Sequence, residues 1–393
     1  MKIKIGLLGN MNNNNYSLLR YLKDENFDAE LLVFDNDPQI FAPKNDSYEN
    51  KYIASIKYIS WGSYEKFIFT SKKKIYEDIK KYHFLIGCGI SPAYLYKIKK
   101  KLNIFIPYGA DIDYFTSYNI TYPWKIIQLW IAVYYQKKAI NKCKIIHLEY
   151  LGNSFDKKWQ KFIGNSTHWS FPGPQIYYKE YTIKNILNYY KKSELYNNLT
   201  NLRNKSDLIL ISPTRHVWGG NLNDPNQKGT DILLNGVKLF IKNNPEIKLT
   251  LIMFKRGPDY EKTLNLIKIL KLNSNIIFFD EVSRKELMLF LQFSDLVCGE
   301  FIHSWRSGGV FYEALLSKRI LMTFRDESKY NNIYPILNAR TPNDINSKIY
   351  FYYKNKEQII KKTEEAFNWF KENVIKKSLK KYFKLLYDEE SKL

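Results

Sequence analysis

The sequence predicts an α/β protein built from two doubly wound domains, each a parallel sheet covered by helices. Short apolar runs alternate with amphipathic stretches along almost the whole chain, which is the pattern of successive strand–helix–strand units. The alternation occurs twice, once in each half of the chain. The 393 residues suffice for two domains, and because 45% of them are hydrophobic, each domain can bury a core.

The first half contains apolar runs that we interpret as strands. They cover residues 3–8, 31–34, 84–86, 104–106 and 145–148. Helices are expected between them, including residues 17–24 and 91–101. Apolar runs this short are typical of parallel strands that are buried on both faces.

The second half repeats the pattern. Its predicted strands cover residues 208–211, 249–253, 276–279, 296–298 and 320–323. Between them, Ile232, Val237 and Ile241 follow helical spacing, as do Leu264 and Ile267.

These patterns suggest domain limits. We expect an N-terminal Rossmann-like domain over residues 1–175 and a C-terminal one over residues 206–355. Residues 176–205, which follow a Pro-Gly-Pro turn and lack a strong strand signal, are expected to connect them. Residues 356–393 predict a basic helical tail with a 3.6-residue apolar period, which we expect to pack back on the N-terminal domain.

The charge is strongly positive, with 61 Lys and Arg against 39 Asp and Glu, a formal net charge of +22. Nucleic acid attracts such a chain, but no nucleic-acid-binding motif is present, so nucleic-acid binding is the less favoured alternative. The lysines occur in short runs in both halves, which favours an anionic membrane surface or simple solvation over one polynucleotide track. These runs begin at Lys72, Lys99, Lys137, Lys157, Lys376 and Lys380.

Several segments bear on localisation. Cys88, Cys143 and Cys298 lie far apart among apolar residues, so neither a metal pair nor a disulfide framework is indicated. The longest apolar stretch, residues 126–135, is well short of the ~20 residues that span a bilayer, and no signal peptide is recognisable. We expect a cytoplasmic protein. Residues 122–144 interleave aromatic side chains with lysines, so docking on the inner membrane face and a buried helix with a basic outer side are both open.

The turn after the first predicted strand is a candidate ligand-binding loop. Gly9 and Asn10 lie between this strand and a helix, where backbone N–H groups and a helix N-terminus point above the sheet. The spacing is not that of a dinucleotide-binding GxGxxG motif. A polar turn whose asparagines tolerate left-handed conformations explains the same residues equally well.

The second half carries cations at the carboxyl ends of its predicted strands. Arg215 and His216 follow the strand at residues 208–211, and Lys228 precedes an amphipathic helix. Ligands of open α/β sheets bind at this edge, and an Arg fork with a Lys point charge suits a diphosphate. An ordinary ion pair and a surface lysine are the alternative.

A further candidate is the segment from residue 299 to residue 324, which predicts strand, loop, helix and strand. Ser307, Gly308 and Gly309 lie at the start of its helix, where glycines let phosphate oxygens approach backbone donors. Glu313 lies one turn later, where a carboxylate can accept hydrogen bonds from a ribose diol. A glutamate that merely favours the helix dipole is the alternative.

The order of Arg215, Lys228, Gly308-Gly309 and Glu313 resembles that of the retaining, nucleotide-sugar-dependent glycosyltransferases of the GT-B fold. Among these it is most similar to the bacterial, glycosyltransferase group 1-like enzymes that build surface polysaccharides. The resemblance is clearest over residues 206–326. It implies two Rossmann-like domains that face each other across a cleft, a nucleoside diphosphate sugar as donor, no separate cofactor, and retention of anomeric configuration.

The resemblance also implies roles for individual residues. Arg215 and Lys228 would neutralise the donor diphosphate, and the loop at Gly308 would contact phosphate through its backbone. Glu313 would hold the ribose, and Val282 would lie near the base. The family commonly has a second Glu eight positions before the ribose-binding one, but here that residue is Trp305, so recognition of the donor sugar must differ.

Asp111 is a candidate on the acceptor side. It follows the predicted strand at residues 104–106 and resembles the family's Gly-x-Asp loop near the acceptor. A carboxylate there can orient or deprotonate an acceptor hydroxyl, and an N-cap of the next helix is the alternative. Neither an HExxH pattern nor a dense carboxylate cluster is present, so we expect metal-independent chemistry.

Together these features predict a glycosyltransferase. It would move a sugar from a nucleoside diphosphate sugar to a hydroxyl of a glycan or lipid-linked acceptor, in surface polysaccharide or glycoconjugate biosynthesis. A nucleotide-sugar epimerase of similar architecture is the alternative among enzymes, because it binds the same donor.

Overall fold

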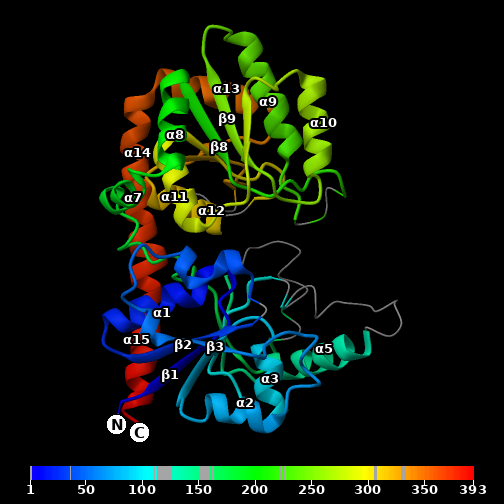
Figure 1. Cartoon of the computed structure of the whole chain (residues 1–393), viewed down its shortest axis with the longest axis vertical. Coiled ribbons are helices and arrows are strands. Elements are labelled where there is room, and N and C mark those ends of the chain that lie inside the picture. Colours follow the sequence, from blue (N-terminus) through cyan, green and yellow to red (C-terminus); the bar gives the residue numbers. More distant parts are fainter. Residues whose placement is uncertain are drawn as a thin grey trace. The chain divides into compact units, whose positions relative to one another are not determined.

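The computed structural model describes residues 2–35, 37–109, 111–112, 126–149, 160, 163–221, 224, 226–304, 308–328 and 333–393. The chain divides into two compact units (Figure 1). Unit 1 comprises Met1–Tyr177 and Asn373–Leu393, and unit 2 comprises Tyr178–Glu372. Each unit has its own sheet and is described separately.

In the described part of unit 1, seven parallel strands form one sheet in the order β3-β2-β1-β4-β5-β6-β7. The order reverses between β1 and β4, which is the point where open α/β sheets place their ligands. The strands are β1 (Lys4–Leu8), β2 (Asp28–Phe34), β3 (Ile56–Ile59), β4 (Phe84–Gly87), β5 (Ile104–Phe105), β6 (Ile145–His147) and β7 (Thr167–Trp169).

Helices and short turns cover this sheet (Figure 1). Its core is rich in rings, and Trp61, Phe67 and Tyr94 pack together in fully buried positions. The helices are α1 (Asn14–Asp24), α2 (Lys72–Ile79), α3 (Ser91–Lys97), α5 (Ile126–Ile140) and α15 (Lys377–Glu390). The 3₁₀ turns are η1 (Met11–Asn13), η2 (Gln39–Phe41), η3 (Pro43–Asn45) and η4 (Ile53–Ser55).

The last helix of the chain, α15, belongs to unit 1. Its Tyr382 and Leu386 are fully buried, and the Tyr382 hydroxyl lies 2.6 Å from Nδ1 of His147 at the end of β6. Near the end of α15, Glu390 accepts a hydrogen bond of 2.9 Å from the backbone N–H of Ile3. These contacts tie α15 to the residue before β1 and to β6, the strand next to the edge strand β7.

In the described part of unit 2, six parallel strands follow the order β10-β9-β8-β11-β12-β13, which reverses between β8 and β11. The strands are β8 (Leu208–Ser212), β9 (Leu249–Phe254), β10 (Ile276–Phe279), β11 (Leu296–Cys298), β12 (Ile320–Thr323) and β13 (Leu337–Asn338). The helices are α7 (Ile183–Tyr190), α8 (Glu194–Lys205), α9 (Thr230–Asn243), α10 (Tyr260–Leu270), α11 (Arg284–Phe293), α12 (Gly309–Leu316), α13 (Pro342–Lys354) and α14 (Lys356–Trp369), followed by the π-helical turn η5 (Phe370–Lys376).

Local sequence sets several of these helix ends. Ser283 caps α11 with its side chain, and Glu286 returns a bond to the Ser283 backbone, which completes a capping box. Thr341 and Asp344 form the same box at α13, where Pro342 occupies the first turn. Since capping fixes where α11 begins, it also fixes the position of Arg284, the first residue of that helix.

The predicted α/β class with two parallel sheets is confirmed, and each strand expected from the sequence is present within three residues of its expected ends. Sequence reasoning missed β3, β7 and β13, which lie at the outer edges of the sheets. Edge strands face solvent on one side, so their apolar signal is weak; in β7 the outer residue Thr167 is exposed.

The predicted connection, residues 176–205, contains α7 and α8, and both helices contact α11 in unit 2. In the predicted tail, α14 contacts α12 and β12 of unit 2, whereas α15 lies in unit 1. None of the described helices combines the length and apolarity needed to cross a bilayer. Among the described residues, no group of three or more His, Cys, Asp or Glu side chains is placed to hold a metal ion.

Candidate functional site

The strongest candidate site lies in unit 2, at the carboxyl ends of the parallel strands. Loops after β8, β9 and β10 carry Arg215, Arg256 and Glu281, and the starts of α11 and α12 carry Arg284 and Glu313. Since all strands of the sheet run in one direction, these loops meet at one edge of the sheet. The sequence singled out Arg215 and Glu313 but not the other three residues.

Glu313 is held by a buried ion pair. Nε of Arg284 donates to its Oε1 over 2.8 Å, and the two side chains are only 8% and 9% exposed. The described residues donate no further hydrogen bond to the carboxylate. A weak signal for Arg284 exists in the sequence, because a cation on the first turn of a helix opposes the helix dipole and needs a partner elsewhere.

Arg256, in the loop after β9, pairs with Glu281 after β10 and lies within electrostatic reach of Arg215 and Glu313. Its Nε pairs with Oε1 of Glu281 at 2.8 Å. Burial lowers the pKa of Arg256, the charge of Arg215 lowers it further, and Glu281 and Glu313 act in the opposite direction. Arg215 and Glu313 are therefore both close enough to act on Arg256, and the four side chains belong to one charged cluster.

Lys228 lies between the loop after β8 and the start of α9, and its Nζ pairs with Oε1 of Glu300 at 2.5 Å. Both side chains are 14% exposed. Glu300 follows β11, so the pair sits where the strand order reverses. The second oxygen of Glu300, Oε2, is buried with no hydrogen-bond partner among the described residues. The sequence predicted the cation but not the carboxylate that balances it.

The N-terminus of α12 begins after a glycine. Gly308 precedes the helix with φ of +147°, a conformation that favours glycine, and a side chain added there would meet nothing within 4 Å. The N-cap residue, Gly308, provides no side-chain cap for the first N–H groups of the helix, which begin at Gly309. Ser307 and Trp305 lie outside the described residues.

His216 is buried and makes hydrogen bonds that join two loops. It is 1% exposed, and its Nε2 lies 2.9 Å from the carbonyl oxygen of Phe254. Its backbone N–H donates to Arg256 O over 2.8 Å, and Gly257 lies so close to this backbone that a Cβ would approach it to 2.5 Å. His216 thus fixes the loop after β8 against the loop after β9 and holds Arg215 in place. Val282 is half-buried between Glu281 and the start of α11.

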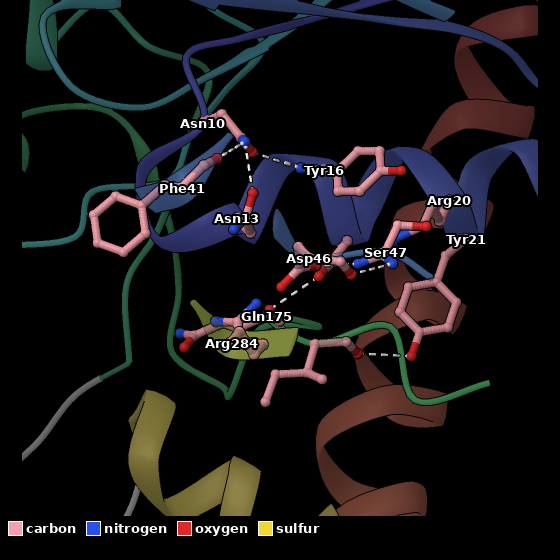
Figure 2. Close-up of polar contacts among 12 residues, drawn as sticks. Asn10, Asn13, Tyr16, Arg20, Tyr21, Phe41, Asp46, Ser47, Gln175 and Arg284 are labelled. Atoms are coloured by element: carbon pink, nitrogen blue, oxygen red, sulfur yellow. Dashed lines mark hydrogen bonds and ion pairs between the residues drawn. The ribbon is translucent and has the colours of Figure 1, made fainter. Parts of the chain in front are cut away.

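In unit 1, Asn10 is fully buried and its side chain organises the loop after β1 (Figure 2). Its Nδ2 donates to Asn13 Oδ1 and to Phe41 O, each over 2.8 Å, and its Oδ1 accepts from the backbone N–H of Tyr16. Its backbone N–H donates to Asp37 over 2.9 Å. The polar groups of Asn10 are therefore engaged within the protein.

Gly9 explains why this turn needs glycine. Its φ is +78°, and a Cβ would approach the Phe34 ring to 2.7 Å and Cys88 Sγ to 2.9 Å. The conformational and the steric demand coincide, so the turn follows from close packing between β1, β2 and β4. Whether Gly9 and Asn10 contact a ligand stays a prediction.

Asp111 is 1% exposed, and both of its carboxylate oxygens accept backbone N–H bonds. Oδ1 accepts from Tyr108 and Gly109 at 3.0 and 3.1 Å, and Oδ2 accepts from Gly89 at 2.9 Å. Burial raises the pKa of Asp111 to about 7, against the lowering effect of these donors. The carboxylate therefore ties the loop after β4 to the loop after β5, and its predicted role toward an acceptor stays a prediction.

Comparison with known families and curated proteins gives no match for this chain. Solved structures do match over nearly the whole chain. A glycosyltransferase from Rickettsia africae is 16% identical with a TM-score of 0.65, and the match covers 99% of this chain and 98% of that one. HepE from Anabaena, solved with UDP-glucose, is 11% identical with a TM-score of 0.63 and complete coverage of both chains.

A third similar structure is a putative UDP-N-acetylglucosamine 2-epimerase from Listeria monocytogenes. It is 15% identical with a TM-score of 0.57, and the match covers 98% of this chain and 97% of that chain. At these identities the similarity concerns the fold. Together with the two parallel sheets, it shows that the chain has the GT-B fold.

Proposed function

We propose that this protein is a glycosyltransferase that uses a nucleoside diphosphate sugar as donor. The observation that carries the proposal is the charged cluster of Arg215, Arg256 and Glu313 at the carboxyl edge of the unit 2 sheet. The N-terminus of α12, which follows Gly308, lies on the same edge. Guanidinium groups and backbone N–H donors suit a diphosphate, and a carboxylate suits a ribose diol.

The cations would act on the leaving group. As the bond between the sugar and the diphosphate breaks, negative charge develops on the phosphate oxygens, and fixed positive groups stabilise that charge. Arg215 is exposed and available for this role, and the N–H groups at the start of α12 add a partial positive charge. Lys228 would contribute from its pair with Glu300, which keeps the lysine in one place before the donor arrives.

Glu313 would bind the ribose. Arg284 occupies its Oε1, and the other oxygen accepts no hydrogen bond from the described residues. The ion pair restricts the rotamers of the carboxylate, so its other oxygen is oriented before the nucleotide binds. Val282 would lie near the base, next to Glu281. Uridine is the base we favour, because the similar HepE structure contains UDP-glucose.

For the acceptor we propose a hydroxyl of a glycan or a lipid-linked sugar, with retention and without a metal ion. These points rest on the sequence resemblance. Asp111 is proposed as the residue nearest the acceptor, and its three backbone hydrogen bonds fix its position.

We further propose that unit 1 docks on an anionic membrane surface through helix α5. Ile127, Trp130, Ile131 and Tyr134 are 55%, 55%, 38% and 58% exposed. Their spacing of i, i+3, i+4 and i+7 places them on one face of the helix. The opposite face, with Ala132, Val133 and Ile140, is buried against α3 and the core.

The charge around this face fits such a surface. The last turn of α5 carries Lys137 and Lys138, and Nζ of Lys138 lies 5.7 Å from the centre of the Tyr134 ring. An apolar stripe with interfacial aromatic rings and a basic end is typical of helices that lie in the membrane interface without spanning it. Anionic lipids add about 1 kcal/mol for each nearby cation.

The epimerase alternative is favoured by one observation, the similarity to the Listeria protein. Both activities bind the same donor, so binding does not separate them. Incubation with a UDP-sugar alone does: an epimerase converts it, whereas a transferase leaves its sugar unchanged until an acceptor is added.

The test of the proposed function is calorimetric binding of UDP and a panel of nucleoside diphosphate sugars. We expect a donor at ~100 times its Kd to stabilise the protein by about 2.7 kcal/mol. Arg215→Ala and Glu313→Ala should each weaken that binding. If both variants bind the nucleotide as the unmodified protein does, the site assignment is wrong.

A further inference from the structure

Arg325 differs from the other arginines that are buried or half-buried in the described part of the chain. Each of those others has an oxygen partner: Arg20 with Asp46, Arg203 with Asp295, Arg256 with Glu281, Arg284 with Glu313, and Arg319 with the carbonyl oxygens of Leu291 and Gln292. Arg325 is 6% exposed, and its Nε and Nη1 are buried without a hydrogen-bond partner among the described residues.

The backbone of Arg325 is fixed. Its N–H donates to Asn338 Oδ1 over 2.9 Å, and Asn338 Nδ2 donates back to its carbonyl oxygen over 2.8 Å. Its guanidinium lies over the ring of Tyr334, 5.2 Å from the ring centre, and Tyr334 packs on Trp369 with ring centres 4.8 Å apart. The side chain thus lies beside an aromatic wall, where the described residues provide no acceptor for Nε or Nη1.

Burial of this guanidinium lowers the stability of the protein unless another molecule supplies a hydrogen-bond acceptor. A guanidinium loses its hydration when it is buried, and it stays charged because arginine does not release its proton in proteins. Burial lowers the pKa of Arg325, and the groups whose charge acts on it are Tyr334 and Glu327. Neither group accepts a hydrogen bond from Nε or Nη1 of Arg325. The cation–π contact with Tyr334 offsets only part of the lost hydration free energy.

We propose that Arg325 anchors an oxyanion-binding site that takes a phosphate or carboxylate group of a bound ligand. The residue follows β12, so it lies at the carboxyl edge of the sheet, where ligands of this fold class bind. The planar fork of arginine matches the two oxygens of either group.

The loop that carries Arg325 is joined to the loop after β11 and is a different loop from those that carry the cluster around Glu313. The backbone N–H of Asp326 donates to Ser304 Oγ over 2.7 Å, which links the loops after β12 and β11. Arg325 follows β12, whereas Arg284 begins α11 and Glu313 lies in α12. The proposal therefore goes beyond donor binding and does not depend on it.

Thermal unfolding of the full chain tests this proposal. The probes are orthophosphate and glucuronate, each compared with chloride at matched ionic strength. One or both anions should raise the Tm of the unmodified protein, and Arg325→Met should abolish that shift. Arg325→Lys, which keeps the charge but not the fork, should show a reduced shift. Whichever anion acts tells whether the site takes a phosphate or a sugar carboxylate.

The Tm of the variants without added anion is a second test. Arg325→Met should raise the Tm by about 2–4 °C, because it removes a desolvated charge. The matched control Arg319→Met should lower it, because two carbonyl oxygens lose their donor. An anion-induced shift that is absent in the unmodified protein, or that persists in Arg325→Met, would overturn the proposal. UDP serves as a separate arm: UDP should stabilise the protein and Arg325→Met alike, so its failure would count against the donor site only.

Discussion

Nε of Arg284 and Oε1 of Glu313 lie 2.8 Å apart, and both residues are more than nine-tenths buried at the side chain. Arg284 begins α11 and Glu313 lies in α12, so the pair connects the starts of two helices that follow different strands. In a buried pair each partner depends on the other, because removal of one leaves an uncompensated charge. This pair is therefore the most sensitive point of the proposed nucleotide site.

Glu313→Gln tests the ribose role. The amide keeps the shape of the side chain but loses the charge, and a hydrogen bond to a charged group contributes about 1.5–3 kcal/mol. We expect UDP affinity, measured by calorimetry, to fall by about one to two orders of magnitude. The control is Glu281→Gln, which breaks the more exposed pair with Arg256. Equal losses in the two variants would argue against a specific role for Glu313.

Arg284→Met tests whether the ion pair positions Glu313. Loss of the guanidinium leaves a buried carboxylate unpaired, so the free energy of unfolding should fall by about 3–5 kcal/mol. The double variant Arg284→Met/Glu313→Gln should regain part of that stability without regaining UDP affinity. Denaturant unfolding and calorimetry on the same samples separate the two effects. Full UDP affinity in the single variant would exclude the positioning role.

Lys228 and Glu300 form a second, partly buried pair, which can be examined by a double-mutant cycle. Lys228→Met should lower the free energy of unfolding by about 3–5 kcal/mol because Glu300 is left without its cation. Lys228→Met/Glu300→Leu should recover most of that loss, since a matched apolar pair replaces the ion pair. The double variant should nevertheless bind UDP weakly. If it binds UDP normally, Lys228 has only a structural role.

His147 makes the stability of unit 1 depend on pH. Burial lowers the pKa of His147 to about 4, from an ordinary value near 6.5. Below pH 6.5 the unfolded chain takes up a proton that the folded chain refuses, so stability from this residue is complete above pH 6.5 and is lost as the pH falls toward 4. The loss should reach about 3 kcal/mol.

Denaturant unfolding at pH 7 and at pH 4.5 measures this effect. His147→Gln does not titrate and can still donate to Phe171 O, the partner of His147 Nε2. The difference in stability between the two pH values should therefore be smaller in His147→Gln than in the unmodified protein. An identical difference would show that another group governs the pH dependence.

The α5 face can be tested by flotation with anionic liposomes. Trp130→Ser removes an exposed side chain, so it should leave the Tm unchanged and lower membrane affinity about tenfold, since insertion of such a ring is favourable by more than about 1.4 kcal/mol. Ile269→Ser, on α10 of unit 2, is the matched control because Ile269 is 76% exposed. Equal flotation of all three proteins, or none by the unmodified one, would refute docking through α5.

Much of the fold is encoded locally. The buried strands of both units are continuous apolar runs, such as β8 and β12, and such runs are legible because every residue is covered on both faces of the sheet. The glycine in the turn after β1 also has a local cause, since Gly9 needs a positive φ and has no room for a side chain. The order of Arg215, Lys228, Gly308 and Glu313 along the chain is likewise a property of the sequence alone.

The ion-pair and hydrogen-bond partners of these residues could not be predicted from the sequence, because they depend on which loops the sheet order brings together. Glu300 meets Lys228 across 72 residues because β11 lies beside β8, and Arg284 meets Glu313 across 29 residues. The sequence could not show either that the polar groups of Asn10 and Asp111 are taken up by their own loops. The sequence by itself determined the two parallel sheets and the kinds of side chain at their edges. Only the tertiary structure decided which charges are paired, and that Nε and Nη1 of Arg325 have no hydrogen-bond partner in the described part of the chain. Pairing requires atoms within hydrogen-bond reach, and the chain order does not set that distance.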